Sequence, residues 1–308
     1  MDQKNKVTII GAGMVGSTTA YTLLTANVTE EIALIDINDK LVASQVMDLQ
    51  HSVPFYSYTK VKVGTYDDVK DSKVVVITCG ASQKTGETRI ELVKKNSAIV
   101  RDIIPKVFKA NPDAIILMVT NPVDVLTYMA VKMFPKKKNQ IIGSGTVLDS
   151  ARFRFLIGQK LGINPKSVHA YIVGEHGDSE VPLWSTAAIG NTPLDRFAKL
   201  TDGERTRIFG QARNAAYAII EGKQATYYGI GAAVTHICKT ILYDHKTVLP
   251  VSHLLEGTYG IHNMCLSTPV IIGCRGVMHE VSPMISAKEK KQLQSSASAL
   301  KKAAQSIV

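Results

Sequence analysis

The sequence predicts an α/β protein, with a doubly wound parallel sheet in residues 1–143 and an α+β domain in residues 144–308. Three observations predict this class. Short apolar runs rich in β-branched residues alternate with helical patterns through the first half, which indicates β-α-β units. The alternation stops near Gly143, where longer helices and a hairpin-like stretch begin. The length of 308 residues suits two domains that each bury a core.

The first half contains five predicted strands and four predicted helices. Each strand is short and apolar throughout, as expected for strands that helices cover on both faces. Each helix has apolar residues at helical spacing. The strands are expected at 7–10, 32–35, 74–78, 115–119 and 140–142, and the helices at 15–25, 40–51, 91–108 and 123–133.

The second half has fewer and longer elements. Helices are expected at 149–161 and 205–223, a β-rich segment at 170–173 and a hairpin at 248–272. The tail, 287–308, predicts an amphipathic helix docked on the body, because its apolar residues alternate spacings of four and three. These residues are Leu293, Ala297, Leu300, Ala304 and Ile307. No Pro- or Ser-rich linker separates the halves, so we expect them to pack tightly.

The composition is that of an average globular protein, with 45% hydrophobic and 20% charged residues. It excludes collagen-like, coiled-coil and disordered chains. No apolar run in the sequence approaches the roughly 18 residues of a membrane span. The first residues lack the layout of a signal peptide. We therefore expect a cytoplasmic protein without a membrane partner.

The cysteines predict neither a disulfide framework nor a zinc site. None of the four belongs to a C-x-x-C pair, and at this chain length reduced thiols are favoured. His262 and Cys265 stand three residues apart but lack a third or fourth ligand at metal spacing. Cys79 has no neighbour in the sequence that would lower the pKa of its thiol. No metal is expected.

The chain is basic, with 36 Lys and Arg against 26 Asp and Glu and a formal net charge of +10. Such a field attracts anions, including nucleic acid, anionic metabolites and phosphorylated cofactors. Nucleic-acid proteins concentrate charge in a stripe with stacking aromatics, whereas here the basic residues are spread out and aromatic residues are only 6%. The one dense run, Lys136 to Lys138, fits a solvated turn. We expect no nucleic-acid partner.

A glycine-rich motif predicts a dinucleotide site of the Rossmann type. Gly11, Gly13 and Gly16 follow the first predicted strand and open the first predicted helix. Asp36 stands 20 positions beyond Gly16 at the end of the next strand, and this context makes the motif specific. The first glycine serves the tight turn, the second the approach to the pyrophosphate and the third the packing of helix on strand.

Asp36 also predicts which dinucleotide binds. Its carboxylate can hydrogen-bond the ribose hydroxyls and would repel a 2′-phosphate, so NAD is expected rather than NADP. The helix that begins near Met14 and Val15 directs unpaired N–H groups and a positive dipole end at the phosphates. A flavin site and a vestigial site are the alternatives.

A second group of motifs predicts acid–base chemistry. His176 lies within the segment 174–179, among small and acidic residues. Asp149 and Arg152 stand one helical turn apart, so both can face one cavity. Asn121 and Asp124 follow a predicted parallel strand, at the edge where open α/β sheets bind ligands. Together these residues supply a proton donor, an orienting carboxylate, an anion clamp and an amide.

In these motifs the chain resembles the lactate/malate dehydrogenase family, and within it the bacterial lactate-specific type. The resemblance covers essentially the whole chain and implies reversible hydride transfer between NADH and pyruvate. It implies catalytic roles for His176 as acid/base, Asp149 and Arg89. It implies substrate contacts for Gln83, Arg89, Asn121, Asp124, Asp149, Arg152 and Thr226. It implies NAD contacts for Gly11, Gly13, Met14, Val15, Gly16, Asp36, Tyr66, Gly80, Ala81, Val119, Asn121 and Ser144.

Elementary chemistry agrees with these roles. Reduction of a 2-oxo acid needs a proton donor that is charged near neutrality, and Asp149 would favour the imidazolium of His176. Arg152 presents a planar fork that matches a carboxylate. Arg89 would supply positive charge where the carbonyl oxygen becomes negative, and its segment, 80–89, is typical of a lid. A surface salt bridge is the alternative for Arg89.

Gln83 predicts the substrate. Malate-specific members of the family carry arginine at this position to meet a second carboxylate, whereas glutamine offers oxaloacetate no counter-charge, and burial of an unpaired carboxylate is costly. Pyruvate is therefore expected, with Thr226 on the other wall of the pocket. The alternatives are a malate dehydrogenase-like enzyme and, from another class, a catalytically silent dinucleotide-binding protein.

The resemblance also concerns regulation and assembly. Related enzymes are usually homotetramers, and many are activated by fructose 1,6-bisphosphate, whose anchors correspond to Arg154 and His169. An acidic partner of Arg154, or packing of His169 beside Tyr171, would make these residues structural instead. The chain begins just before its first strand, so no tetramer-locking arm is expected and ligand-linked assembly is favoured. Leu41 replaces a lysine of many relatives, so no cofactor contact is expected there.

Overall fold

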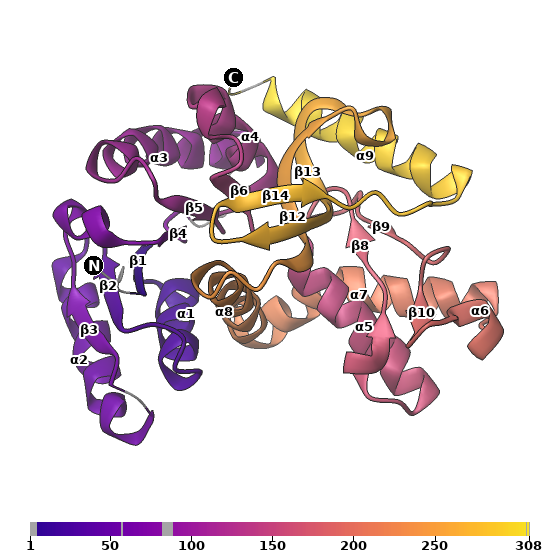
Figure 1. Ribbon diagram of the computed structural model, residues 1–308, viewed down its shortest axis with the longest axis horizontal. Helices are drawn as coiled ribbons and strands as arrows, with labels where there is room; N and C mark the ends of the chain where they lie inside the picture. Colours follow the sequence, from indigo (N-terminus) through magenta and orange to yellow (C-terminus); the bar gives the residue numbers. More distant parts are fainter. Residues whose placement is uncertain (1–4, 57, 82–88, 306, 308) are drawn as a thin grey trace.

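The computed structural model describes residues 5–56, 58–81, 89–305 and 307. Its centre is a nine-stranded sheet of order β14-β13-β12-β6-β5-β4-β1-β2-β3 (Figure 1). Six parallel strands come from the first half: β1 (Lys6–Ile10), β2 (Glu31–Ile35), β3 (Lys60–Val63), β4 (Val74–Ile77), β5 (Ile115–Met118) and β6 (Ile141–Gly143). Three antiparallel strands come from the second half: β12 (Thr247–Glu256), β13 (His262–Gly273) and β14 (Gly276–Glu280).

Helices cover both faces of the parallel strands, as their apolar sequences predict. These helices are α1 (Met14–Thr25), α2 (Asp39–Tyr56), α3 (Arg89–Ala110) and α4 (Val123–Met133), with short 3-10 turns at η1 (Tyr66–Asp71) and η2 (Pro135–Lys137). The five strands and four helices predicted for this half are confirmed, with small differences at their ends. β3 was not predicted, because Lys and Val alternate in this edge strand and only Val61 is buried.

The second half begins with α5 (Val147–Leu161) and ends with α9 (Ala287–Ala304), and the hairpin expected at 248–272 is β12 and β13. α8 was not predicted, because Gly229 and Gly231 interrupt its helical pattern. Gly231 brings α8 close to α1, since a Cβ there would lie 2.8 Å from Thr18 Cγ2. The other elements are η3 (Pro165–Ser167), β7 (Val168–His169), β8 (Ile172–Val173), β9 (Val181–Pro182), β10 (Ala188–Ile189), β11 (Thr192–Pro193), α6 (Leu194–Phe197), α7 (Asp202–Lys223), α8 (Tyr228–Leu242) and η4 (Thr258–Gly260).

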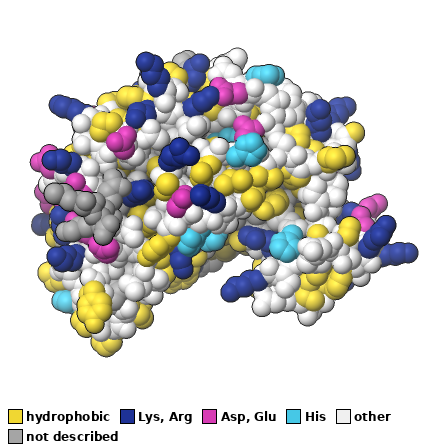
Figure 2. Space-filling view, in the orientation of Figure 1, with side chains coloured by type: hydrophobic (Ala, Val, Ile, Leu, Met, Phe, Trp, Pro, Cys, Tyr) yellow, Lys and Arg dark blue, Asp and Glu magenta, His cyan; other side chains and the backbone are white. Residues whose placement is uncertain are grey.

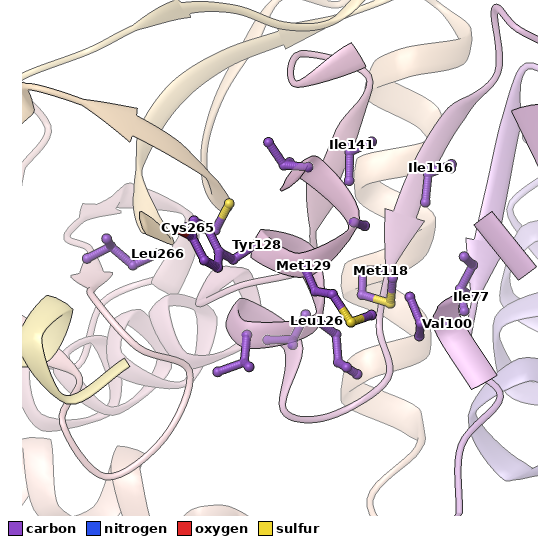
Figure 3. Close-up of a cluster of buried hydrophobic side chains, with 14 of the residues drawn as sticks. Ile77, Val100, Ile116, Met118, Leu126, Tyr128, Met129, Ile141, Cys265 and Leu266 are labelled. Carbon is purple, nitrogen blue, oxygen red and sulfur yellow. The ribbon is translucent and has the colours of Figure 1, made fainter. Parts of the chain in front are cut away.

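Two core clusters lie on opposite faces of the sheet, because successive strand residues point to opposite sides. Ile77 and Met118 face one cluster, where Figure 3 shows them near Val100 of α3 and Met129 of α4. The neighbouring Val76 and Leu117 face the other cluster, under α1 and α8. The tail packs on the first cluster through the five apolar residues predicted to dock it. Those residues are Leu293, Ala297, Leu300, Ala304 and Ile307.

The sheet crosses the predicted domain boundary. Ser252 of β12 lies opposite Gly143, the last residue of β6, so the second half extends the sheet of the first. Both halves also contribute side chains to both core clusters. The expected tight packing of the halves is confirmed, and it arises from a shared sheet and a shared core.

Charged side chains are scattered over the face of the molecule shown in Figure 2. On the face shown in Figure 2, Lys and Arg side chains lie among acidic and apolar ones and form no continuous stripe. This face is hollowed at its lower edge, between the lobe that carries α2 and the lobe that carries α6 (Figures 1 and 2). The basic run forms η2, where Lys137 Nζ donates to Pro112 O at 2.6 Å and Lys138 pairs with Glu256. In the parts of the chain that the structure describes, no helix is long and apolar enough to span a membrane.

Candidate active site

The turn from β1 to α1 is shaped by its three glycines. Gly11 has φ +110°, and a Cβ on it would lie 2.5 Å from the backbone nitrogen of Cys79. A Cβ on Gly16 would lie 1.8 Å from the carbonyl oxygen of Gly11, so helix and strand approach too closely for any side chain. Gly13 has no atom within 4 Å of such a Cβ, and no side chain caps α1 at Met14. The open space and the uncapped N–H groups fit a pyrophosphate.

Asp36 lies at the end of β2, directly beside this turn. Its Oδ2 accepts a hydrogen bond from Ala12 N at 2.6 Å, and its Oδ1 accepts one from Asn38 N at 2.9 Å. The carboxylate is thereby fixed on the first turn of the glycine motif. The structure thus fits the predicted order of glycine turn, helix N-terminus and ribose-binding acid.

The other predicted cofactor residues follow neighbouring parallel strands at the same edge. Gly80 and Ala81 come after β4, Val119 and Asn121 after β5, and Ser144 after β6. Val15 follows Met14 in α1. Tyr66 differs, because it lies in η1 and packs half-buried against the core, with Lys106 Nζ 5.4 Å from its ring centre. Burial raises the pKa of Tyr66 to about 12.

Asn96 of α3 ties two of these strand ends together, and the sequence reasoning missed it. Its Oδ1 accepts a hydrogen bond from Ala81 N at 2.8 Å, and its Nδ2 donates to Asn121 O at 2.8 Å. The side chain is buried. The sequence shows no signal for this role, because the partners of a buried amide become visible only in the fold.

One carboxylate joins the predicted proton donor to the predicted anion clamp. Asp149 Oδ2 lies 2.6 Å from His176 Nδ1, and Asp149 Oδ1 accepts a hydrogen bond from Arg152 Nη1 at 2.9 Å. Asp149 and Arg152 come from the first turns of α5, and His176 comes from the loop between β8 and β9. The Asp149 side chain is 3% exposed, whereas that of His176 is 26% exposed. The carboxylate is therefore held inside while the imidazole still reaches solvent.

This arrangement keeps His176 charged. Burial by itself would lower the pKa of His176, but the charge and hydrogen bond of Asp149 outweigh it and raise the pKa to about 9. Burial would likewise raise the pKa of Asp149, but His176 and Arg152 lower it below its ordinary value. At neutral pH the three side chains form an imidazolium, a carboxylate and a guanidinium.

Asp124 lies beneath the catalytic loop. Its Oδ2 accepts a hydrogen bond from the backbone nitrogen of His176 at 2.7 Å, and its side chain is buried. Burial raises the pKa of Asp124 to about 6. The resemblance implied a substrate contact for Asp124. The structure shows its carboxylate against the backbone that carries His176, and the substrate contact stays a prediction.

Glu180 is a further buried carboxylate that the sequence reasoning missed. It lies four residues after His176, and among the described residues its Oε1 has no hydrogen-bond partner. Burial, followed by the charge of Asp149, raises the pKa of Glu180 to about 8, while His176, Arg152 and Arg213 oppose the shift. Its signal in the sequence was an acidic residue directly after the segment 174–179 that carries His176.

The remaining predicted substrate residues are described in part. Gln83 lies outside the described residues. Arg89 begins α3, but its side chain lies outside the described part of the structure. Thr226 lies half-buried in the short connection between α7 and α8. Next to it, Lys223 Nζ lies 3.4 Å from the centre of the Tyr227 ring.

The two predicted effector residues lie on α5 and β7, which pack together. Arg154 Nε donates to Ser150 O at 3.3 Å, and the guanidinium makes no ion pair with any described residue. Burial lowers the pKa of Arg154. His169 is exposed on β7. The acidic partner that would have made Arg154 structural is therefore absent from the described residues.

Known proteins match this chain over nearly its whole length. Residues 5–143 match the model of the lactate/malate dehydrogenase NAD-binding domain, and residues 146–308 match that of the lactate/malate dehydrogenase alpha/beta C-terminal domain. The chain is 46% identical to the L-lactate dehydrogenase of Acetivibrio thermocellus over 96% of this chain and 95% of that protein. It is 44% identical to the L-lactate dehydrogenase of Thermus aquaticus over 98% and 99% of the two chains.

A solved structure shares both the fold and much of the sequence. The minor L-lactate dehydrogenase of Enterococcus mundtii, in a ligand-bound form, has a TM-score of 0.97 and 38% identity, covering 100% of this chain and 99% of that one. The predicted α/β fold class is confirmed by these matches and by the sheet order. The chain belongs to the lactate/malate dehydrogenase family.

Proposed function

We propose that the protein is an NAD-dependent L-lactate dehydrogenase that interconverts pyruvate and L-lactate. The observation that carries the proposal is the chain from Arg152 through Asp149 to His176, in which one carboxylate joins a charged histidine to a guanidinium. These three side chains lie at the same edge of the sheet as the glycine turn. Relatives named L-lactate dehydrogenase, at 42–46% identity, support the same reaction.

The cofactor, when bound, supplies or accepts the hydride. The glycine turn and the N-terminus of α1 would hold its pyrophosphate, and Asp36 its ribose. The residues that follow β4, β5 and β6 would line the remainder of the site. Asp36 is already fixed by two backbone N–H groups, so its carboxylate needs no rearrangement to receive a hydroxyl donor.

His176 handles the proton. Its Nδ1 is bonded to Asp149, so Nε2 is the nitrogen left to exchange a proton with the substrate oxygen. In pyruvate reduction the charged His176 donates this proton to the oxygen that becomes the hydroxyl group. In lactate oxidation the neutral imidazole accepts it. Asp149 stabilises the charged form, which favours the donor state in the resting enzyme.

Arg152 orients the substrate. Its Nη1 is used by Asp149, and the other guanidinium N–H groups can pair with the carboxylate of a 2-oxo acid. Since Asp149 also holds His176, the anion clamp and the proton donor are fixed relative to one another. With its carboxylate on Arg152, the substrate would present its oxygen to Nε2. Arg89 would add positive charge at that oxygen.

The choice of pyruvate rests on Gln83 and Thr226. A first experiment measures initial NADH oxidation with pyruvate and with oxaloacetate at neutral pH, with and without fructose 1,6-bisphosphate. Preference for pyruvate supports the proposal, and preference for oxaloacetate would overturn the role of Gln83. Substitution Gln83→Arg should move the preference toward oxaloacetate, and an unchanged ratio would remove Gln83 from the pocket.

A catalytically silent dinucleotide-binding protein would bind NADH without turnover of either substrate. The variant His176→Asn separates binding from chemistry, because His176 lies at the substrate and Asp36 at the cofactor. It should bind NADH nearly as well as the wild type and turn over far more slowly. A collapse of NADH affinity would mean that His176 has been given the wrong role.

We also propose that fructose 1,6-bisphosphate binds near Arg154 and His169 and that the protein is a homotetramer in the cytoplasm. The burial of Arg154 without an ion pair among described residues supports an anion there. Exposed apolar side chains on three neighbouring helices, α1, α2 and α8, support contact with another copy: Tyr21, Met47, Phe55, Tyr56 and Tyr228. Sedimentation with and without the bisphosphate tests the oligomeric state and its dependence on this effector. A lone monomer in each case would contradict the homotetramer and the effector's part in its assembly.

We assign NAD binding to residues 1–143 and substrate binding to residues 144–308. The edges of the two family-model matches, at residues 143 and 146, support this division. The division is one of function, because the sheet and the core are shared. Asn121 and Asp124 are the exceptions, since they come from the first part and are assigned to the substrate, and Asp124 meets the second part at the backbone nitrogen of His176.

A further inference from the structure

The C-terminal helix reaches the catalytic loop through one buried serine. α9 packs against β9, which follows the loop that carries His176, and against β13, whose Ser267 pairs with Gly174 at the start of that loop (Figure 1). Ser296 Oγ accepts a hydrogen bond from the backbone nitrogen of Glu175 at 2.9 Å, and it lies 2.9 Å from Ser179 Oγ. Its side chain is 1% exposed. One hydroxyl of a helix 120 residues away in sequence therefore touches both ends of the segment around His176.

The directions of these hydrogen bonds follow from the donors available. The carboxylate of Glu175 can only accept, so Ser179 Oγ donates to Glu175 Oε2. Having used its proton there, Ser179 Oγ must accept from Ser296 Oγ. The chain therefore runs from Glu175 N–H to Ser296, on to Ser179 and back to the Glu175 carboxylate. Such a closed chain strengthens each of its members.

The helix and the loop approach each other closely at Gly174. Gly174, at the start of the loop, has φ +92°, and a Cβ on it would lie 2.9 Å from Ser296 Oγ. Beyond β9, Ser185 N donates to Glu289 Oε1 of α9 at 3.0 Å, and Ser185 Oγ donates to Glu289 Oε2. α9 is thus bonded to the chain on both sides of His176.

We infer that Ser296 is a positioning residue for the catalytic histidine: through Glu175 and Ser179, α9 fixes the loop that holds His176 against Asp149. This inference rests on the proposed function. Among the described residues, Asp124 also holds the His176 backbone and Asp149 its ring, and both act on His176 itself. Away from His176, Gly174 pairs with Ser267 of β13 and Tyr217 Oη donates to Asp178 Oδ1. Ser296 acts on the two neighbours Glu175 and Ser179.

Loss of the Ser296 hydroxyl should loosen the bond between His176 and Asp149 and so weaken the effect that keeps the imidazole charged. The groups that face His176 are Asp149 and Arg152 from α5, Asp124 from α4 and Glu180 from its own loop. Arg213 of α7 acts on Glu180. Ser296→Ala alters none of these charges. A change in the pH profile would therefore report the position of His176.

The test compares Ser296→Ala with two matched variants, Ser295→Ala and Ser298→Ala. Both control serines are exposed on the same helix, and among the described residues each donates to the backbone of that helix alone, Ser295 to Lys291 O and Ser298 to Gln294 O. For each protein, kcat and KM for pyruvate are measured from pH 6 to pH 10, together with NADH affinity by fluorescence and the unfolding temperature. Ser296→Ala should lower kcat/KM at pH 8 by about tenfold, the effect of one buried hydrogen bond.

The alkaline fall in kcat/KM of Ser296→Ala should also move to lower pH, while NADH affinity and both control variants stay as in the wild type. An unchanged rate and pH profile would overturn the inference, and so would an equal loss in Ser295→Ala. If Ser296→Ala does not fold, Ser179→Ala breaks the same chain from the loop side and must reproduce the shift, or the inference fails. A wild-type protein inactive on pyruvate would instead refute the proposed function.

Discussion

Asp149 should control the pH range in which pyruvate is reduced, and Asp149→Asn removes its charge while keeping its shape. In the wild type the pKa of His176 is raised from its ordinary 6.5 to about 9 by Asp149 against the opposing effect of burial. Without the charge, we expect the pKa to return toward its ordinary 6.5. At pH 8 a group with pKa 9 is about 90% protonated and one with pKa 6.5 about 3%, so kcat/KM should fall about 30-fold through protonation alone. At pH 6 the same reasoning gives a loss of less than about twofold.

The assay is the initial rate of NADH oxidation with subsaturating pyruvate, measured from pH 6 to pH 10 for wild type, Asp149→Asn and Asp113→Asn. Asp113 is exposed, so its variant controls for the loss of one negative charge. The direction of the pH dependence follows from the reaction. Pyruvate reduction needs protonated His176, so activity is present below the pKa of His176 and is lost as the pH rises through it. An equal loss for Asp149→Asn at pH 6 and pH 8 would refute the reasoning, because Asp149 would then act only through orientation.

Three further predictions concern the cofactor turn, the anion clamp and the core. Gly16→Ala should lower both NADH affinity and the unfolding temperature, because its Cβ would lie 1.8 Å from Gly11 O, whereas Gly13→Ala should lower NADH affinity alone. Equal unfolding temperatures of the two variants would contradict this prediction. Arg152→Lys should raise the KM for pyruvate about 10- to 100-fold, since lysine lacks the planar fork, and steady-state kinetics that show an unchanged KM would exclude the clamp. Leu117→Ala, at a fully buried position, should cost about 2–5 kcal/mol in urea unfolding, and a cost below about 1 kcal/mol would mean that the core closes around it.

Much of the fold could be predicted from the sequence, because hydrophobic periodicity records which face of an element is buried. The parallel strands are buried on both faces, so their sequences are continuous apolar runs. The elements that were missed follow other rules. β3 is an edge strand with exposed Lys60 and Val63. α8 carries Gly231 where it packs closely on α1 and Gly229 where it lies against Leu148 of α5. Hydrophobic periodicity does not reveal a helix whose pattern is interrupted by glycines that allow close packing on its neighbours.

The site was predicted where its residues form local motifs and missed where distant residues complete it. Asp149 and Arg152 are one turn apart, and the structure brings His176 to them as expected. Asn96 and Ser296 act through hydrogen bonds to segments far away in the sequence, and a lone asparagine or serine in a helix carries no signal of its partner. Only the fold shows which backbone groups these side chains meet.

The pairing of β12 with β6 has a consequence for the order in which the chain can fold during synthesis. When residue 143 leaves the ribosome, β6 is still an open sheet edge, and α1 lacks the α8 surface that meets it through Thr22 and Thr235. Open edges invite pairing with other chains, so the first half must await more than a hundred residues before it is complete. The contact between β6 and β12 also restricts the residue at position 143, since a Cβ on Gly143 would lie 2.9 Å from Ser252 Cβ. Recombination between relatives at this boundary therefore has to exchange the two strands as a matched pair.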